Sequence, residues 1–209
     1  MSDHRPEPTG WRALASGAIG AGLVILGLLA VMWVLEIVDF VLGGALDQFG
    51  IRAWDPEGLI GIFFAPFLHV GFAHLMANSV PLIILGFLAA VRGIGRFLWA
   101  SLIIIVVGGV GAWLTTTPGV TVLGASGLVF GYFGYVMARG IFDRRVLDLV
   151  IGIGVAVAYY SLLWGLLPNQ EGISWQGHLF GLVGGVVAAW VLRRKRVTSV
   201  DGRALGGGV

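Results

Sequence analysis

Residues 72–91 read FAHLMANSVPLIILGFLAAV, and this stretch decides the class of fold. A helix that crosses the hydrocarbon core of a bilayer needs about 20 mostly apolar residues. The stretch meets that requirement and contains no Asp, Glu, Lys or Arg. It nevertheless carries His74 and Asn78 near its start, four residues apart and so on one helix face. Polar side chains inside a bilayer cost free energy, which makes both residues candidates for function.

Five further apolar stretches accompany this one, and together they predict an all-α bundle of six transmembrane helices. They cover about residues 14–37, 97–114, 126–138, 146–166 and 175–192, of which 126–138 is short and rich in glycine. The composition agrees, because 57% of residues are apolar and 11% are charged, against about 25% charged in a typical soluble domain. An ordinary soluble globule and a disordered chain are both excluded.

The expected organisation is one membrane domain with two short ends. We expect a short cytoplasmic tail over residues 1–13, the six-helix domain over residues 14–192, and a basic, disordered tail over residues 193–209. The chain has no cysteine, which excludes a disulfide framework, a thiolate nucleophile and a Cys-ligated metal.

The distribution of basic residues predicts the orientation. If six helices alternate, all of the 13 Lys and Arg residues except Arg52 fall on one side. The positive-inside rule then places both termini in the cytoplasm. The run Arg193–Arg196 is interpreted as a stop signal that also meets anionic lipid, rather than as a nucleic-acid site.

Four polar residues converge in this topology. The second, fourth and sixth helices run from outside to inside, so His74, Asn78, Ser126 and His178 lie at similar depth below the outer surface. A serine becomes a nucleophile when a base lies within hydrogen-bond reach, and His178 is the best candidate for that base. We expect a dyad, because no Asp or Glu lies in the first turns of these helices.

The same set supplies candidate donors for an oxyanion. The side chains of His74 and Asn78 can each donate an N–H group, and the backbone N–H of Ser126 opens a helix. Glycines support a close approach of the fourth and sixth helices, since Gly127 and Gly131, like Gly181 and Gly185, are spaced as GxxxG. Ordinary membrane packing explains either glycine pair equally well.

Each feature also has a plainer interpretation. Ser126 alone is more often a helix cap, Asn78 alone glues helices, and His69 is best explained as a structural hydrogen-bonder. Phe130 is core packing or a ring that stacks beside His178. Three histidines are also enough for a zinc site, but there is no HExxH motif and no nearby carboxylate to act as base. We therefore expect no metal and no cofactor.

Taken together, the residues resemble the rhomboid intramembrane serine proteases. The resemblance covers about residues 14–192, and the features that carry it are His69-x₄-His74-x₃-Asn78, Gly124-Ala125-Ser126-Gly127 and His178-x₂-Gly181-x₃-Gly185. It implies a rhomboid-like bundle with a water-filled cavity open to the outside, and a short, central fourth helix. By that likeness Ser126 is the nucleophile, His178 the base, and His74, Asn78 and the Ser126 backbone form the oxyanion hole, with His69, Gly124, Gly127 and Phe130 in support.

The likeness further implies a setting and a substrate class. The first outer loop lies partly in the membrane, and the fifth helix and residues 168–174 gate access. Substrates are single-span membrane proteins, cut near the outer face of a bacterial inner membrane. The chain departs from the family in having Phe130 in place of the usual Tyr, and in lacking an obvious Trp-Arg pair, for which Arg52-Ala53-Trp54 is the nearest match.

Two rival functions stay open beside the protease. One is a non-catalytic rhomboid-like protein that binds transmembrane helices. The other is a transporter with a histidine proton relay, which needs acidic partners within the spans or inverted repeats; neither is evident. No nucleic-acid partner and no particular oligomeric state are predicted.

Overall fold

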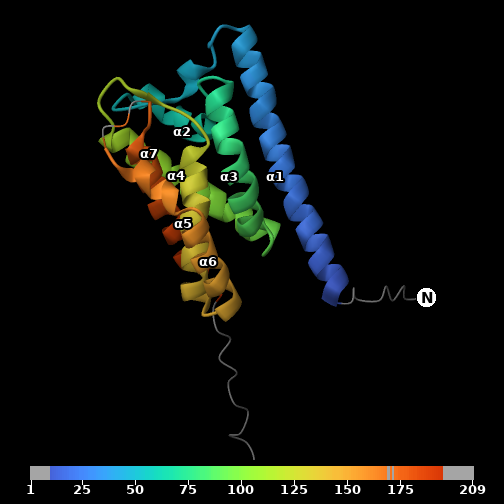
Figure 1. Ribbon diagram of the computed structural model, residues 1–209. Helices are drawn as coiled ribbons and strands as arrows, with labels where there is room; N and C mark the ends of the chain where they lie inside the picture. Colours follow the sequence, from blue (N-terminus) through green and yellow to red (C-terminus); the bar gives the residue numbers. More distant parts are fainter. Residues whose placement is uncertain (1–9, 169, 171, 195–209) are drawn as a thin grey trace, which may run out of the picture.

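The computed structural model describes residues 10–168, 170 and 172–194, which are mostly helical (Figure 1). The two predicted tails lie largely outside these residues. The α-helices are α1 (Gly10–Val41), α2 (Gly61–Phe64), α3 (Phe72–Ala90), α4 (Ile94–Thr115), α5 (Ser126–Asp143), α6 (Val146–Ala158) and α7 (Trp175–Val191). The 3₁₀ helices are η1 (Asp47–Phe49), η2 (Pro56–Ile60), η3 (Ala65–Phe67) and η4 (Tyr160–Leu166), and the strands are β1 (Ile51–Arg52) and β2 (Thr121–Val122).

The prediction of an all-α membrane bundle is confirmed in its main features. Within the described residues, α1, α3 and α4 are long and apolar enough to cross a membrane, and α6 with η4 forms a bent fourth candidate. The count of six spans stays a prediction. Helix α5 is less apolar than these candidate spans. Neighbouring helices surround it, so few of its side chains face lipid, and its buried positions include tyrosines and Arg139.

Helices α5 and α7 form the centre of the bundle. They pack against each other along their lengths, with α4 against α7 and α6 against α5. Helix α1 lies at the edge against α3 (Figure 1). A Cβ on Gly181 would meet the backbone of Gly127, and one on Gly185 would meet the carbonyl oxygen of Gly131. The small residues therefore set how closely the two central backbones approach.

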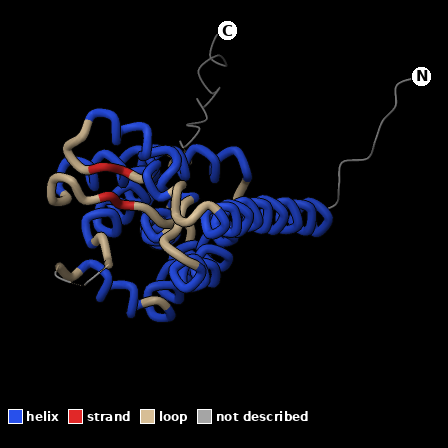
Figure 2. Tube along the Cα trace, turned by 90° about the horizontal axis from the view of Figure 1, so that it is seen from above, coloured by secondary structure: helices blue, strands red, loops and turns tan. Residues whose placement is uncertain are grey.

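The long connection between α1 and α3 folds into short helices and one strand. Residues 56–67 form the short helices η2, α2 and η3 rather than one helix long enough to span a membrane. Strand β1 pairs antiparallel with β2, so that Ile51 lies opposite Val122 (Figure 2). This two-residue pairing is the one departure from an all-α fold in the described residues, and two-residue strands are too short to show in a sequence pattern.

The predicted stretch 146–166 is not one continuous helix, although α6 and η4 together stay a candidate span. The chain bends by 65° between α6 and η4, at Tyr159, whose backbone leaves the helical region. No glycine or proline marks the bend in the sequence. Its consequence is that η4 turns toward α7 and places Gly165 beside His178.

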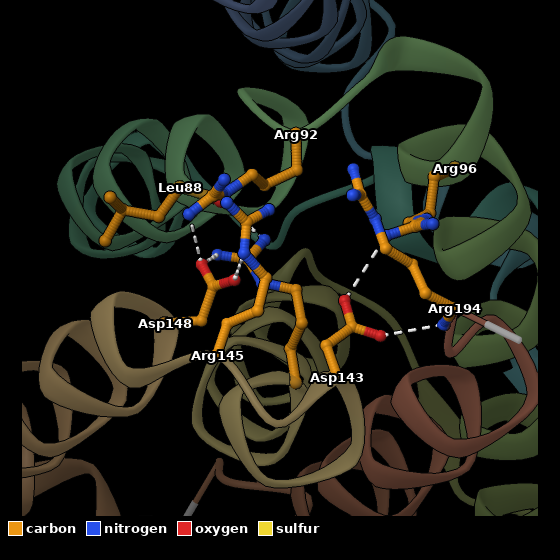
Figure 3. A network of polar contacts seen from close by, with 8 residues as sticks. Leu88, Arg92, Arg96, Asp143, Arg145, Asp148 and Arg194 are labelled. Atoms are coloured by element: carbon orange, nitrogen blue, oxygen red, sulfur yellow. Dashed lines mark hydrogen bonds and ion pairs between the residues drawn. The ribbon is translucent and has the colours of Figure 1, made fainter. Parts of the chain in front are cut away.

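Arginines and buried carboxylates gather at one end of the bundle, called here the arginine end (Figure 3). Asp148, at the start of α6, is 1% exposed and lies 2.7 Å from Arg92, 3.3 Å from Arg139 and 3.8 Å from Arg145. A buried carboxylate inside the fifth predicted stretch was not expected. It pairs with arginines rather than with a histidine, so it gives a proton relay no partner.

Candidate active site

A cavity of about 970 Å³ opens at the other end of the bundle, away from the arginines. The first turns of α3, α5 and α7 meet there. The cavity is lined by residues that the sequence singled out, namely His74, Asn78, Gly124, Ser126, Gly127, Phe130 and His178. The structure thus brings residues from three distant parts of the chain to one hollow.

Ser126 is the first residue of α5. The residue before it, Ala125, is the N-cap, and its own side chain makes no capping hydrogen bond. The interpretation of Ser126 as a helix cap is therefore wrong. Its hydroxyl is left to the cavity, and its backbone N–H lies at the helix end where the dipole is positive.

The imidazole of His178 is fixed by two contacts. Its Nδ1 lies 2.8 Å from the carbonyl oxygen of Gly165. A carbonyl oxygen only accepts hydrogen bonds, so Nδ1 carries the proton and Nε2 has a free lone pair. The Phe130 ring stacks on the imidazole, with centroids 4.2 Å apart. Both interpretations of Phe130 are confirmed, because the ring is buried and also stacks on His178.

His69 lies behind the cavity wall. It is 2% exposed, and its Nε2 accepts the backbone N–H of Ala125 at 3.1 Å. Burial, together with the neighbouring His74, lowers the pKa of His69 to about 4. The ring is therefore neutral near pH 7, as an acceptor must be, and it holds the residue before Ser126 in place.

His74 packs against the turn that precedes Ser126. Gly124 has a φ of +122°, and a Cβ on it would lie 2.6 Å from Cε1 of His74. Only glycine combines that backbone conformation with this close approach. Asn78, one turn further along α3, donates from Nδ2 to the carbonyl oxygen of His74 at 3.1 Å, which aligns the amide group at the cavity wall.

Within the described residues, no hydrogen bond joins Ser126 to His178. The two residues line one cavity, and their helices approach as closely as Gly127 and Gly181 allow. Bonds between a nucleophile and its base are often longer in a free enzyme than in its substrate complex.

Two contributors were missed by the sequence reasoning, the carbonyl of Gly165 and the backbone N–H of Ala125. Both act through the main chain, so no side-chain motif reveals them. The only sequence signal was Gly165 within an apolar run. A Cβ there would lie 3.0 Å from both Nδ1 of His178 and Cζ of Phe130. Among the described residues, no three His, Asp or Glu side chains meet where a metal could bind.

The fold and the cavity together define a polytopic helical membrane protein in which a serine and a histidine line the same cavity. The family model of the Rhomboid domain matches residues 56–195, which include all of α2 to α7. The chain belongs to the rhomboid family.

Bacterial proteins are similar to this chain in sequence. The uncharacterized protein Rv1337 of Mycobacterium tuberculosis is 44% identical over 179 residues, covering 82% of this chain and 75% of the relative. The uncharacterized protein ML1171 of Mycobacterium leprae is 40% identical over 179 residues, covering 82% and 71%. Rhomboid protease GluP of Bacillus subtilis is 31% identical over 128 residues, covering 60% of this chain and 24% of the relative.

Proposed function

We propose that this rhomboid is a serine endopeptidase that cuts membrane proteins, with Ser126 as nucleophile and His178 as general base. The observation that carries the proposal is the 2.8 Å bond between Nδ1 of His178 and the Gly165 carbonyl. It leaves Nε2 able to take a proton, in the same cavity as a serine hydroxyl. A rhomboid protease among the relatives gives independent support.

The reaction follows from this arrangement. Nε2 of His178 accepts the proton of the Ser126 hydroxyl as Oγ attacks the peptide carbonyl. The oxyanion that forms receives hydrogen bonds from His74, Asn78 and the Ser126 backbone N–H. His178 then returns the proton to the leaving nitrogen as the C–N bond breaks. Water, activated by the same imidazole, hydrolyses the Ser126 ester.

No carboxylate is needed to orient the base. The described residues that line the cavity include neither Asp nor Glu. The Gly165 carbonyl accepts from Nδ1 as the aspartate of a triad does, and Phe130 limits rotation of the ring. A neutral carbonyl stabilises the imidazolium less than a carboxylate does, so modest turnover is expected.

The substrates are single-span membrane proteins, cut near the outer face. A transmembrane helix shields its own peptide groups, so a substrate has to unwind locally before Ser126 can reach a carbonyl. Gly, Pro or polar residues near the outer end of its span lower that cost. The arginine end then faces the cytoplasm of a bacterial cell by the positive-inside rule, with residues 14–192 as the membrane domain and both tails inside.

A second candidate function rests on the missing bond between Ser126 and His178. If the two never approach within hydrogen-bond distance, the cavity serves to bind transmembrane helices without cutting them.

Labelling with a fluorophosphonate separates the two functions. The reagent modifies a serine only when a base activates it. We expect the native protein to be modified at Ser126 by peptide mass, and Ser126→Ala and His178→Ala to stay unlabelled. Ser161 lines the same cavity, so Ser161→Ala is the matched control and keeps the label. A native protein that is unlabelled while folded favours helix binding.

A further inference from the structure

A second hollow lies at the arginine end, between the last turns of α5 and α7. Its charged lining is Arg144, Arg193, Arg194 and Asp143. All three arginines are exposed. The protease proposal assigns no role to this hollow, which is a helix length away from Ser126.

The carboxylate in this hollow is already neutralised. Asp143 lies 3.4 Å from Arg96 and accepts the backbone N–H of Arg194 at 2.8 Å (Figure 3). Its side chain is 4% exposed. By contrast, Arg144 and Arg193 pair with no carboxylate in the part of the chain that the structure describes. The hollow therefore offers positive charge without an acidic partner that would repel an anion.

The ends of the two helices do not oppose an anion either. The backbone N–H of Arg144, whose φ is +52°, reaches the carbonyl oxygens of Gly140 and Ile141 at the end of α5. On α7, the Arg193 side chain donates to the carbonyl oxygen of Trp190 at 2.7 Å. Carbonyl groups that carry the negative end of each helix dipole are thus occupied.

An apolar surface adjoins the charged one. Ile141, Trp190 and Val191 all belong to the last turns of α5 and α7, and each has half or more of its surface exposed. In a membrane protein such surface faces acyl chains. The guanidinium of Arg193 lies 5.0 Å from the centre of the Trp190 ring, which places a cation and an interfacial aromatic ring side by side.

We propose that this hollow binds an anionic glycerophospholipid. The phosphate lies among Arg144, Arg193 and Arg194, and the acyl chains follow Ile141 and Val191. Guanidinium groups suit phosphate oxygens because they present paired donors. A zwitterionic lipid binds less well, since its ammonium group would meet the same arginines.

The site also has a consequence for the rest of the molecule. It joins α5 to α7, the two helices that carry Ser126 and His178 at their other ends. A bound lipid therefore stabilises the helix pair that forms the candidate active site. The binding itself does not depend on the proposed proteolysis, so the two proposals fail separately.

Native mass spectrometry of the full chain in a non-ionic detergent tests the site. Phosphatidylglycerol and phosphatidylcholine are titrated against the native protein, Arg144→Asn, Arg193→Gln and the double variant. Asparagine is used at position 144 because it tolerates a left-handed backbone. Arg52→Gln, at the opposite end, removes the same charge and is the control. Melting curves establish that each variant is folded.

We expect phosphatidylglycerol to bind more tightly than phosphatidylcholine. Each pocket substitution is expected to weaken its binding roughly fivefold, and the double variant about 25-fold, since a basic residue near an anionic lipid contributes about 1 kcal/mol. Arg52→Gln binds as the native protein does. Equal affinity for both lipids, or pocket variants that bind like the control, would overturn the proposal. Displacement of the lipid by millimolar inorganic phosphate would also overturn it, because the ligand would then be the free anion.

Discussion

The phenyl ring of Phe130 lies flat against the imidazole of His178, with ring planes 10° apart. Phe130 follows Ser126 by four residues, one turn of α5. The helix that carries the candidate nucleophile therefore also carries a wall for the candidate base. The imidazole is therefore positioned by two contacts: Phe130 packs on one ring face, and the Gly165 carbonyl oxygen accepts a hydrogen bond from Nδ1.

Replacing Phe130 by leucine is expected to lower the rate of cleavage while the protein stays folded. Aromatic stacking contributes about 0.5–1.5 kcal/mol beyond burial, which corresponds to a decrease of roughly 2- to 12-fold in kcat. Phe130→Tyr keeps the ring and is the matched control, with activity near that of the native chain. Initial rates on one model substrate measure the effect. A leucine variant as fast as the native protein would mean that the stacking does not position His178.

The approach of α5 to α7 is tested at Gly181. A Cβ there would meet the backbone of Gly127, so we expect Gly181→Ala to push the helices apart, lower the free energy of unfolding by about 1–3 kcal/mol and abolish most cleavage. Gly154, on α6, has nothing within 4 Å of an added Cβ. Gly154→Ala should therefore stay within about 1 kcal/mol of the native protein. Unfolding in detergent measures both, and equal effects would contradict the packing argument.

The outline of the fold could be read from the sequence because hydropathy and helix length are local properties. The predicted stretch 72–91 corresponds to α3 and the stretch 97–114 to α4, each within a few residues. Helix α5 runs five residues beyond its predicted end at Ala138, as far as Asp143. Its extra turn contains Arg139 and Asp143, whose charges look like a helix end, but these side chains pair with Asp148 and Arg96 of other parts of the fold.

The features that could not be predicted depend on contacts across the fold. Nothing near Tyr159 in the sequence marks the bend that brings Gly165 to His178. In the same way, Asp148 looks unfavourable in an apolar stretch, because the sequence does not show that Arg92, from the turn after α3, and Arg139, from α5, pair with it. By contrast, the sequence alone predicts that His74, Asn78, Ser126 and His178 lie close together. When spans alternate in direction, the first turns of the second, fourth and sixth helices lie on the same side of the membrane.

Removing the buried carboxylate of Asp148 is expected to destabilise the arginine end. Asp148→Asn leaves Arg139, which is nearly as buried, without its counter-charge, and breaking a buried pair in this way costs about 3–5 kcal/mol. Asp55→Asn breaks a solvent-exposed pair with Arg52 and should cost much less, because water and salt screen exposed ion pairs. Unfolding free energies measure the contrast. Similar losses in the two variants would show that the Asp148 network contributes little.

The stability of the protein should decrease in acid through His69, which lies outside the membrane-spanning helices. Its pKa is about 4 in the folded chain, against an ordinary value of 6.5 for a solvent-exposed histidine. Between these pH values the unfolded chain binds a proton that the folded chain does not. The contribution of His69 is therefore constant above pH 6.5 and decreases as the pH falls toward 4, by at most about 1.4 kcal/mol per unit.

The matched variant for this test is His69→Gln. Its side-chain oxygen can still accept the Ala125 N–H but does not titrate in this range. Unfolding free energies are compared between pH 7 and pH 4.5, and the native protein should lose more stability than the variant. Parallel pH profiles would exclude His69 as the source of acid sensitivity.

The most direct test of the central claim is cleavage of a model single-span protein by the purified chain, with fragments identified by mass. We expect the native protein to cut near the outer end of the span, and Ser126→Ala and His178→Ala, both folded, to produce no fragment. Cutting by all three proteins at the same site would contradict the assignment of Ser126 and His178 as the reacting pair.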